Sequence, residues 1–207
     1  MAFNKKQNRV EGNNSMRIGI FGGSFNPPHK MHESIANQLI EKGIIDKVIF
    51  VPTSNFYPKA GLINDEDRFK MLTLMIDKKE EYEVSKYEFG RRTYTYQTLE
   101  HFKQENPYDE IYFICGSDNL EQLYTWKEYE KILGGYKLIV IPRRHNMQEL
   151  LDKYDKYKNN IIIAELENNY LSSTVVRGYL EDEKYEEVRE YINENVLKYI
   201  VDNNLYK

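Results

Sequence analysis

Two adjacent glycines followed by two histidines form the clearest candidate site in the chain. Residues 17–32 read RIGIFGGSFNPPHKMH, which is an apolar run, the pair Gly22-Gly23, a turn with two prolines and a helix start. Glycines let a ligand approach the main chain closely, because no Cβ blocks it. Backbone N–H groups at such a turn and at a helix N-terminus can hold an anion. The segment therefore predicts a phosphate-binding loop.

The two histidines of this segment suit the same ligand. His29 and His32 are three residues apart and would share one face of the first helical turn, where imidazole N–H groups can donate to phosphate oxygens. The segment lacks both the G-x-G-x-x-G pattern and a Walker A loop. Two histidines without an H-E-x-x-H pattern argue against a zinc site. The structural alternative is a tight turn that carries two surface histidines.

A second candidate segment lies near the C-terminus. Residues 171–178 read LSSTVVRG, in which Ser172 or Ser173 would cap the following helix, a contribution of about 1 kcal/mol. Beyond this structural role, the hydroxyl groups, the first N–H groups of the helix and Arg177 one turn later can converge on a phosphate.

The elements that must position these residues follow from apolar patterning. Six short apolar runs predict buried parallel strands: Arg17–Phe21, Lys47–Val51, Glu83–Ser85, Ile111–Cys115, Lys137–Ile141 and Ile161–Ala164. Helices are expected near His29–Lys42, which Gly43 would end, and near Asp65–Lys78, Tyr96–Glu105, Leu120–Leu133, Met147–Tyr154, Ser173–Glu181 and Tyr185–Asn203.

This alternation predicts an α/β fold: a Rossmann-like, doubly wound parallel sheet of five to six strands with helices on both faces. Ligands of such sheets lie beyond the carboxyl ends of the strands, which is where the glycine loop falls. With 207 residues, we expect a flexible N-terminal arm over residues 1–15 and a single domain over residues 16–207.

Composition excludes several classes of function. The 29 basic and 33 acidic residues give a net charge of −4, which argues against a nucleic-acid-coating protein. The one cysteine, Cys115, rules out an intrachain disulfide and favours a reducing compartment. The apolar runs are too short to cross a membrane, and the N-terminus does not read as a secretory signal. We therefore expect a cytoplasmic protein that binds neither nucleic acid nor membrane.

Both candidate segments resemble signatures of the nucleotidyltransferase superfamily. Residues 22–32 resemble G-[TS]-F-[DN]-P-x-H-x-G-H, with Met31 in place of the last glycine, and residues 171–177 resemble I-S-S-T-x-[IV]-R. The resemblance implies that His32, with His29 and Arg177, is catalytic. It also implies an ATP site formed by Gly22, Gly23, Ser24, Phe25, Ser172, Ser173 and Thr174.

The middle of the chain resembles one branch, the bacterial nicotinate-mononucleotide adenylyltransferases. Its two matching stretches are GRRTYTYQTL at residues 90–99 and GSDNLEQLYTW at residues 116–126. The resemblance implies that Trp126 stacks on the acceptor's pyridine ring. It further assigns acceptor-binding roles to Thr93, Tyr94 and Thr95 near the carboxylate, and to Gly116 and Asp118 where the two nucleotides meet. In the loop after the second strand the sequence departs from the family's P-P-H-K-like stretch, and we expect Lys59 to replace its basic residue in binding the acceptor.

The implied reaction joins ATP, carried with Mg²⁺, to nicotinate mononucleotide and gives deamido-NAD and pyrophosphate. The attacking phosphate is already anionic, so alignment and charge stabilisation suffice without a general base. Three alternatives remain: the same chemistry on nicotinamide mononucleotide, on phosphopantetheine or another phosphorylated small molecule, or a non-catalytic nucleotide sensor. The sequence also leaves a homo-oligomer open.

Overall fold

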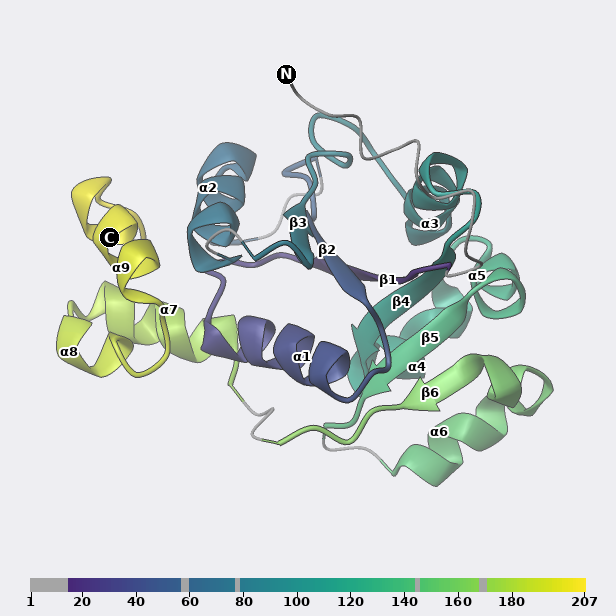
Figure 1. Cartoon of the computed structure of the whole chain (residues 1–207). Coiled ribbons are helices and arrows are strands. Elements are labelled where there is room, and N and C mark those ends of the chain that lie inside the picture. Colours follow the sequence, from purple (N-terminus) through teal and green to yellow (C-terminus); the bar gives the residue numbers. More distant parts are fainter. Residues whose placement is uncertain (1–14, 57–59, 77–78, 144–145, 168–170) are drawn as a thin grey trace, which may run out of the picture.

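The structure, a computed structural model, is built on one six-stranded sheet in which every pairing is parallel (Figure 1). It describes residues 15–56, 60–76, 79–143, 146–167 and 171–207. The strand order is β3-β2-β1-β4-β5-β6. The strands are β1 (Arg17–Gly23), β2 (Lys47–Pro52), β3 (Tyr82–Val84), β4 (Glu110–Gly116), β5 (Lys137–Ile141) and β6 (Ile161–Ile163). The prediction of a parallel sheet of five to six strands is confirmed.

Helices cover both faces of this sheet. One apolar cluster joins it to α1 (Lys30–Glu41), α2 (Asp65–Ile76), α7 (Ser173–Glu181), α8 (Tyr185–Val188) and α9 (Glu194–Asp202). A second cluster lies on the other face, with α3 (Thr95–Glu105), α4 (Ser117–Gln122), α5 (Tyr129–Gly135) and α6 (Met147–Lys153). Two 3₁₀ segments, η1 (Leu123–Thr125) and η2 (Asp155–Asn160), complete the described elements. Since β1 and β4 are neighbours, successive connections diverge there and leave a crevice at their carboxyl ends.

Helix α1 ends as its sequence predicts. Gly43 has a φ of +64°, the left-handed conformation that glycine adopts without a Cβ penalty. The N–H of Gly43 donates to the carbonyl of Ile40, and the N–H of Ile44 donates to that of Leu39. These two bonds are those of a Schellman motif, which satisfies the last carbonyls of the helix. The chain then turns directly into β2.

The prediction of one helix over Leu120–Leu133 is wrong. The chain forms α4, then η1, and starts α5 only after Glu128, whose φ is +56°. The hydroxyl of Tyr154 explains how the break is tolerated: it donates to the carbonyl of Leu120 at 2.8 Å and accepts from the N–H of Tyr124 at 3.2 Å. Backbone groups that a continuous helix would have paired are thus satisfied by a side chain.

The prediction of one long helix over Tyr185–Asn203 is also wrong. The helical conformation ends after α8 and resumes in α9, which the side chain of Asn193 caps by accepting from the N–H of Asn195 at 2.8 Å. The carbonyl of Tyr191 in the break accepts the N–H of Lys30 at 2.8 Å, so the break holds the start of α1. Helix α9 then packs on α2, where the hydroxyl of Tyr199 donates to Asp67 at 2.7 Å.

Two further expectations concern the N-terminal arm and membrane-spanning helices. The predicted flexible arm, residues 1–15, lies outside the described residues except for the exposed Ser15. Among the residues that are described, no helix combines the length and the apolar character needed to cross a bilayer.

Arg68 on α2 is fully buried and forms a hydrogen bond to the backbone of the glycine loop. Its guanidinium donates to the carbonyls of Ser24 at 2.8 Å and Thr53 at 2.5 Å, and it lies 2.6 Å from the carboxylate of Asp65. A further bond reaches the carbonyl of Ile63 at 3.1 Å. A buried cation is tolerated only when it is paired and hydrogen-bonded in this way.

We predict that Arg68→Met lowers the free energy of unfolding by about 3–5 kcal/mol, because it leaves three backbone carbonyls and the half-buried carboxylate of Asp65 without this donor. The matched control is Arg17→Met, which breaks a solvent-exposed pair with Asp46 and should cost about 1 kcal/mol or less. Urea denaturation followed by circular dichroism measures both. Equal losses in the two variants would show that Arg68 has no special structural role.

Candidate active site

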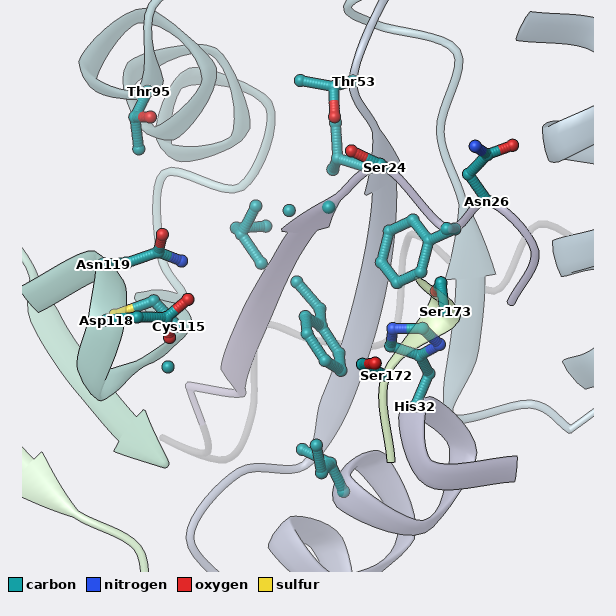
Figure 2. A pocket seen from close by; sticks show the side chains of 18 of the residues that line it. Ser24, Asn26, His32, Thr53, Thr95, Cys115, Asp118, Asn119, Ser172 and Ser173 are labelled. Carbon is teal, nitrogen blue, oxygen red and sulfur yellow. The ribbon is translucent and has the colours of Figure 1, made fainter. Parts of the chain in front are cut away.

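A cavity of about 500 Å³ lies beyond the carboxyl ends of the central strands. Figure 2 shows His32, Ser172 and Ser173 on one side of it and Asp118 and Asn119 on the other. The cavity gathers most of the residues that the sequence singled out: Gly22, Gly23, Ser24, Phe25, His29, His32, Thr93, Thr95, Gly116, Asp118, Trp126, Ser172, Ser173, Thr174 and Arg177. Segments more than 150 residues apart along the chain thus line one space.

The two histidines pack against each other at the start of α1. His29 is the residue before the helix and has extended backbone, while His32 lies in the first turn. Their rings stack with centroids 3.7 Å apart and an interplanar angle of 22°. The edge-to-face contact of His32 with Phe25, at 4.9 Å between centroids, fixes the imidazole from its other side. Phe25 is itself buried and has a φ of +46°.

Hydrogen bonding fixes which nitrogen of His32 carries the proton. The backbone N–H of His29 donates to Nδ1 of His32 at 3.1 Å, so Nδ1 is an acceptor and the neutral ring is protonated at Nε2. In His29, by contrast, Nδ1 is buried and has no hydrogen-bond partner among the described residues. A buried polar atom without a partner is costly, and it marks a place where a ligand can supply one.

Both imidazoles are held neutral. Burial lowers the pKa of His29 to about 4, and the positive charge of Arg143 acts in the same direction. Burial, followed by the neighbouring His29 and then Arg143, lowers the pKa of His32 well below its usual value. Near pH 7, the two rings therefore act as neutral hydrogen-bond donors, and the fixed positive charge comes from arginine.

Helix α7 is fastened directly to the loop between β1 and α1. The hydroxyl of Ser173 donates to the carbonyl of Pro27 at 2.9 Å, and Arg177 donates to the carbonyl of Asn26 at 2.8 Å. The side chain of Ser172 accepts from the N–H of Val175 at 3.5 Å and so caps the helix, as predicted. These bonds bring the start of α7 to the cavity beside the histidines.

Asn26 is the residue on which these connections converge, and sequence analysis assigned it no role. Its side chain donates to the carbonyl of Gly61 at 2.7 Å and accepts from the N–H of Ile63 at 3.3 Å. It also accepts from the hydroxyl of Tyr206, near the C-terminus, at 2.9 Å. Nothing in the sequence pattern pairs positions 26 and 206, so only the fold reveals this contact.

The other end of the cavity is lined by Thr93, Thr95 and Trp126. Trp126 lies in the break between η1 and α5, with extended backbone, and its ring meets Phe113 edge-to-face at 6.1 Å. Trp126 therefore reaches the cavity because the helix predicted over Leu120–Leu133 is interrupted at this position. Tyr94 precedes α3 but does not line the cavity: its ring lies under the ammonium group of Lys127, 4.7 Å away.

Between the two ends, the backbone of Gly116 passes close to charged side chains. A Cβ on Gly116 would overlap Asp118 Oδ1 and lie 3.0 Å from Arg143 Nε, so any other residue there would displace these two side chains. Arg143 and Asp118 face each other at 3.5 Å, and Asp118 Oδ1 is buried without a hydrogen-bond partner in the described part of the chain. The site thus sets one carboxylate and one guanidinium beside an open backbone.

The other residues named in the sequence analysis differ in how they relate to the cavity. Lys59 lies outside the described residues. Met31, the departure from the signature, lies inside α1 with helical backbone, which accepts a side chain. Cys115 lines the cavity, but burial raises the pKa of its thiol to about 12, so it is no nucleophile near neutral pH. Glu88 and Thr98 also line the cavity; Thr98 belongs to the stretch 90–99 but was given no role, and no sequence signal pointed to Glu88.

Comparisons with known proteins agree on one family. The model of the Cytidylyltransferase-like family matches residues 20–178. A protein of Carboxydothermus hydrogenoformans named "Probable nicotinate-nucleotide adenylyltransferase" is 34% identical over 200 residues, covering 92% of this chain and 98% of its own. A protein of the same name from Endomicrobium trichonymphae is 36% identical over 197 residues, covering 92% and 99%.

A solved structure gives the same result in three dimensions. The nicotinic acid mononucleotide adenylyltransferase of Plasmodium falciparum, complexed with NaAD, superposes with a TM-score of 0.73 at 28% identity. The match covers 92% of this chain and 97% of the other. The likeness therefore extends over almost the whole length of both chains.

The neutral state of His29 predicts a specific pH dependence of stability. Because its pKa is about 4 when folded and about 6.5 when unfolded, the unfolded chain binds the extra proton between these values. The free energy of unfolding should therefore fall as pH falls from 7 to 4, by about 3 kcal/mol from this residue. His29→Asn should remove this part of the decline. If urea denaturation gives parallel pH profiles for both proteins, His29 is not held neutral by the fold.

Proposed function

We propose a function that starts from one finding: the chain belongs to the Cytidylyltransferase-like family. The protein is an adenylyltransferase that transfers the adenylyl group of ATP to nicotinate mononucleotide, giving deamido-NAD and pyrophosphate in NAD biosynthesis. The observation that carries this function is the single cavity that joins the glycine–histidine loop and the start of α7 to the Thr93–Trp126 end. The names of the relatives at 34% and 36% identity support the same acceptor.

The loop and α7 form the proposed ATP end. Gly22 and Gly23 leave the backbone open to the triphosphate, while Ser24 and Phe25 shape the turn. Ser172, Ser173 and Thr174 begin α7, whose first N–H groups favour an anion. The hydroxyl of Ser173 donates to the carbonyl of Pro27, so the N–H groups at the start of the helix carry the phosphate contact.

The chemistry at this end is stabilisation of charge. The acceptor phosphate attacks the α-phosphorus of ATP, and the bond to the leaving pyrophosphate breaks. His32 offers its Nε2–H, His29 supplies a second imidazole, and Arg177 contributes a fixed positive charge one turn into α7. Preorganised donors of this kind act where negative charge develops in the transition state. None of these groups needs to remove a proton.

The acceptor occupies the other end in this proposal. Trp126 stacks on the pyridine ring, and Thr93 and Thr95 approach its carboxylate. Gly116 leaves room for the backbone to approach the dinucleotide, and Asp118 hydrogen-bonds to ribose hydroxyls. Tyr94, which packs under Lys127, serves this end through the start of α3 and not through its ring.

A magnesium ion carried with ATP fits this donor set. The described residues hold no cluster of three or more His, Cys, Asp or Glu side chains, and Asp118 offers one buried oxygen without a partner. Phosphate oxygens and water would supply most ligands of Mg²⁺, which binds proteins through few carboxylates. When bound, the ion neutralises charge on the triphosphate. We further infer that residues 16–207 act as one catalytic unit in the cytoplasm.

The acceptor is tested by initial rates of pyrophosphate release with ATP and Mg²⁺. We expect turnover with nicotinate mononucleotide to exceed turnover with nicotinamide mononucleotide and with phosphopantetheine. His32→Ala should reduce the rate by about 100-fold or more, as loss of a preorganised donor does. His101→Ala is the matched control, since His101 stacks on Tyr87 outside the cavity, and it should keep the parent rate.

Each other result has a defined meaning. Preference for a different acceptor would keep the ATP end and overturn the acceptor assignment. Tight binding of ATP without turnover of any acceptor would indicate a nucleotide sensor. A parent rate in His32→Ala would contradict the role given to this imidazole.

The chain contains a single tryptophan, so its fluorescence reports on the acceptor end alone. We expect nicotinate mononucleotide to quench the emission of Trp126, because a stacked pyridinium ring contacts the indole. ATP, bound at the other end, should leave most of the emission unchanged. Quenching by ATP and not by the mononucleotide would reverse the assignment of the two ends.

A further inference from the structure

One carboxyl group in the cavity has no part in the chemistry described so far. Glu88 lies between β3 and α3, is half-buried and lines the cavity. Its Oε1 accepts a hydrogen bond of 2.7 Å from the hydroxyl of Thr98, which is buried on α3. Thr98 follows Thr95 by three residues, so both lie on one helix face. The Glu88 carboxyl is thus held within one helical turn of a residue assigned to the acid group of the acceptor.

No cation neutralises this carboxyl in the described part of the chain, where Glu88 forms no ion pair. The charged groups on the surrounding segments are engaged elsewhere: Lys86 with Glu66, Arg91 and His101 on the ring of Tyr87, Arg92 on Tyr94, and Arg143 with Asp118 across the cavity. Burial raises the pKa of Glu88 to about 7, and the bond from Thr98 acts in the opposite direction. Near neutral pH, Glu88 is therefore present in both its protonated and its ionised form.

The two forms treat an acid and an amide differently. An ionised Glu88 repels a carboxylate nearby, whereas a protonated carboxyl donates a strong, charge-assisted hydrogen bond to it. An amide carries no net charge and gains nothing comparable from the protonated form. The protonation state of Glu88 can therefore separate nicotinate mononucleotide from its amide, which differs at that group alone.

We propose that Glu88 is a specificity-determining residue: in its protonated form it donates a hydrogen bond to the acceptor's carboxylate and so favours a pyridine carboxylate over the amide. This inference rests on the proposed function. Binding to a molecule with ionised Glu88 takes one proton from solvent, which forms one O–H bond on the carboxyl; a molecule with protonated Glu88 takes up none, and no bond of either substrate breaks at this step. The acceptor's own phosphate is common to acid and amide, so it does not affect the comparison.

Proton uptake tests the proposal without catalysis. Titration calorimetry at pH 7 in two buffers of different ionisation enthalpy measures the protons taken up when each mononucleotide binds. We expect the parent protein to take up about half a proton more than Glu88→Gln with the acid, and to show no such difference with the amide. Glutamine keeps an oxygen that accepts from Thr98, so the local fold is retained. Glu100→Gln, an exposed position on α3, is the control and should match the parent.

The pH profile gives a second readout. The ratio of kcat/KM for the acid to kcat/KM for the amide should fall about 30-fold between pH 6 and pH 8.5 in the parent protein. In Glu88→Gln it should stay constant, because the amide N–H donates at every pH. Thr98→Val should move the midpoint to higher pH, since it removes the bond that favours the ionised form.

Two results would overturn the inference: equal proton uptake in the parent and Glu88→Gln, or parallel pH profiles of the selectivity ratio. Either result, obtained with an enzyme that still turns over the acid, leaves the proposed function intact. Failure of both mononucleotides to bind or react would instead overturn the proposed function on which the inference depends.

Discussion

The bonds that fasten α7 to the loop after β1 are the constraint on which the site depends. Arg177 donates to the carbonyl of Asn26, and Ser173 donates to that of Pro27. About 150 residues separate the two partners in sequence, and the parallel sheet brings them together because both follow its carboxyl edge. Asn26 is in turn held through its side chain by Gly61, Ile63 and Tyr206. The first signature, the second and the C-terminal residues are therefore joined in one hydrogen-bonded assembly.

The site combines neutral histidines with positively charged arginines. Burial keeps His29 and His32 neutral, while Arg177 and Arg143 supply the positive charge. A site built in this way can bind a strongly anionic substrate while its histidines stay neutral, without their first taking up protons. The carboxylate of Asp118 faces Arg143 and is partly offset by it. Neutral donors and fixed cations suit a reaction in which negative charge moves between phosphates.

Sequence patterning predicted the parts of the fold that follow from local rules. Continuous apolar runs gave the strands, and Gly43 gave the end of α1, because burial on both faces and a left-handed turn each leave a clear signal. The helix breaks near Trp126 and Asn193 were missed, because the hydroxyl of Tyr154 and the first N–H of α1 stabilise them from distant parts of the chain. Periodicity within a segment carries no information about such partners.

The same distinction holds for the site. Most residues of the two signatures were placed in one cavity by their position after strands, whereas the ring of Tyr94 points elsewhere because Lys127 offers it a partner. Arg68, Asn26 and Glu88 owe their importance to burial and to partners that only the fold supplies. A crystal structure with deamido-NAD would show whether both nucleotides share this cavity. We expect the pyridine ring against Trp126 and the phosphates between His32 and the start of α7. Phosphates bound away from both histidines would contradict this expectation.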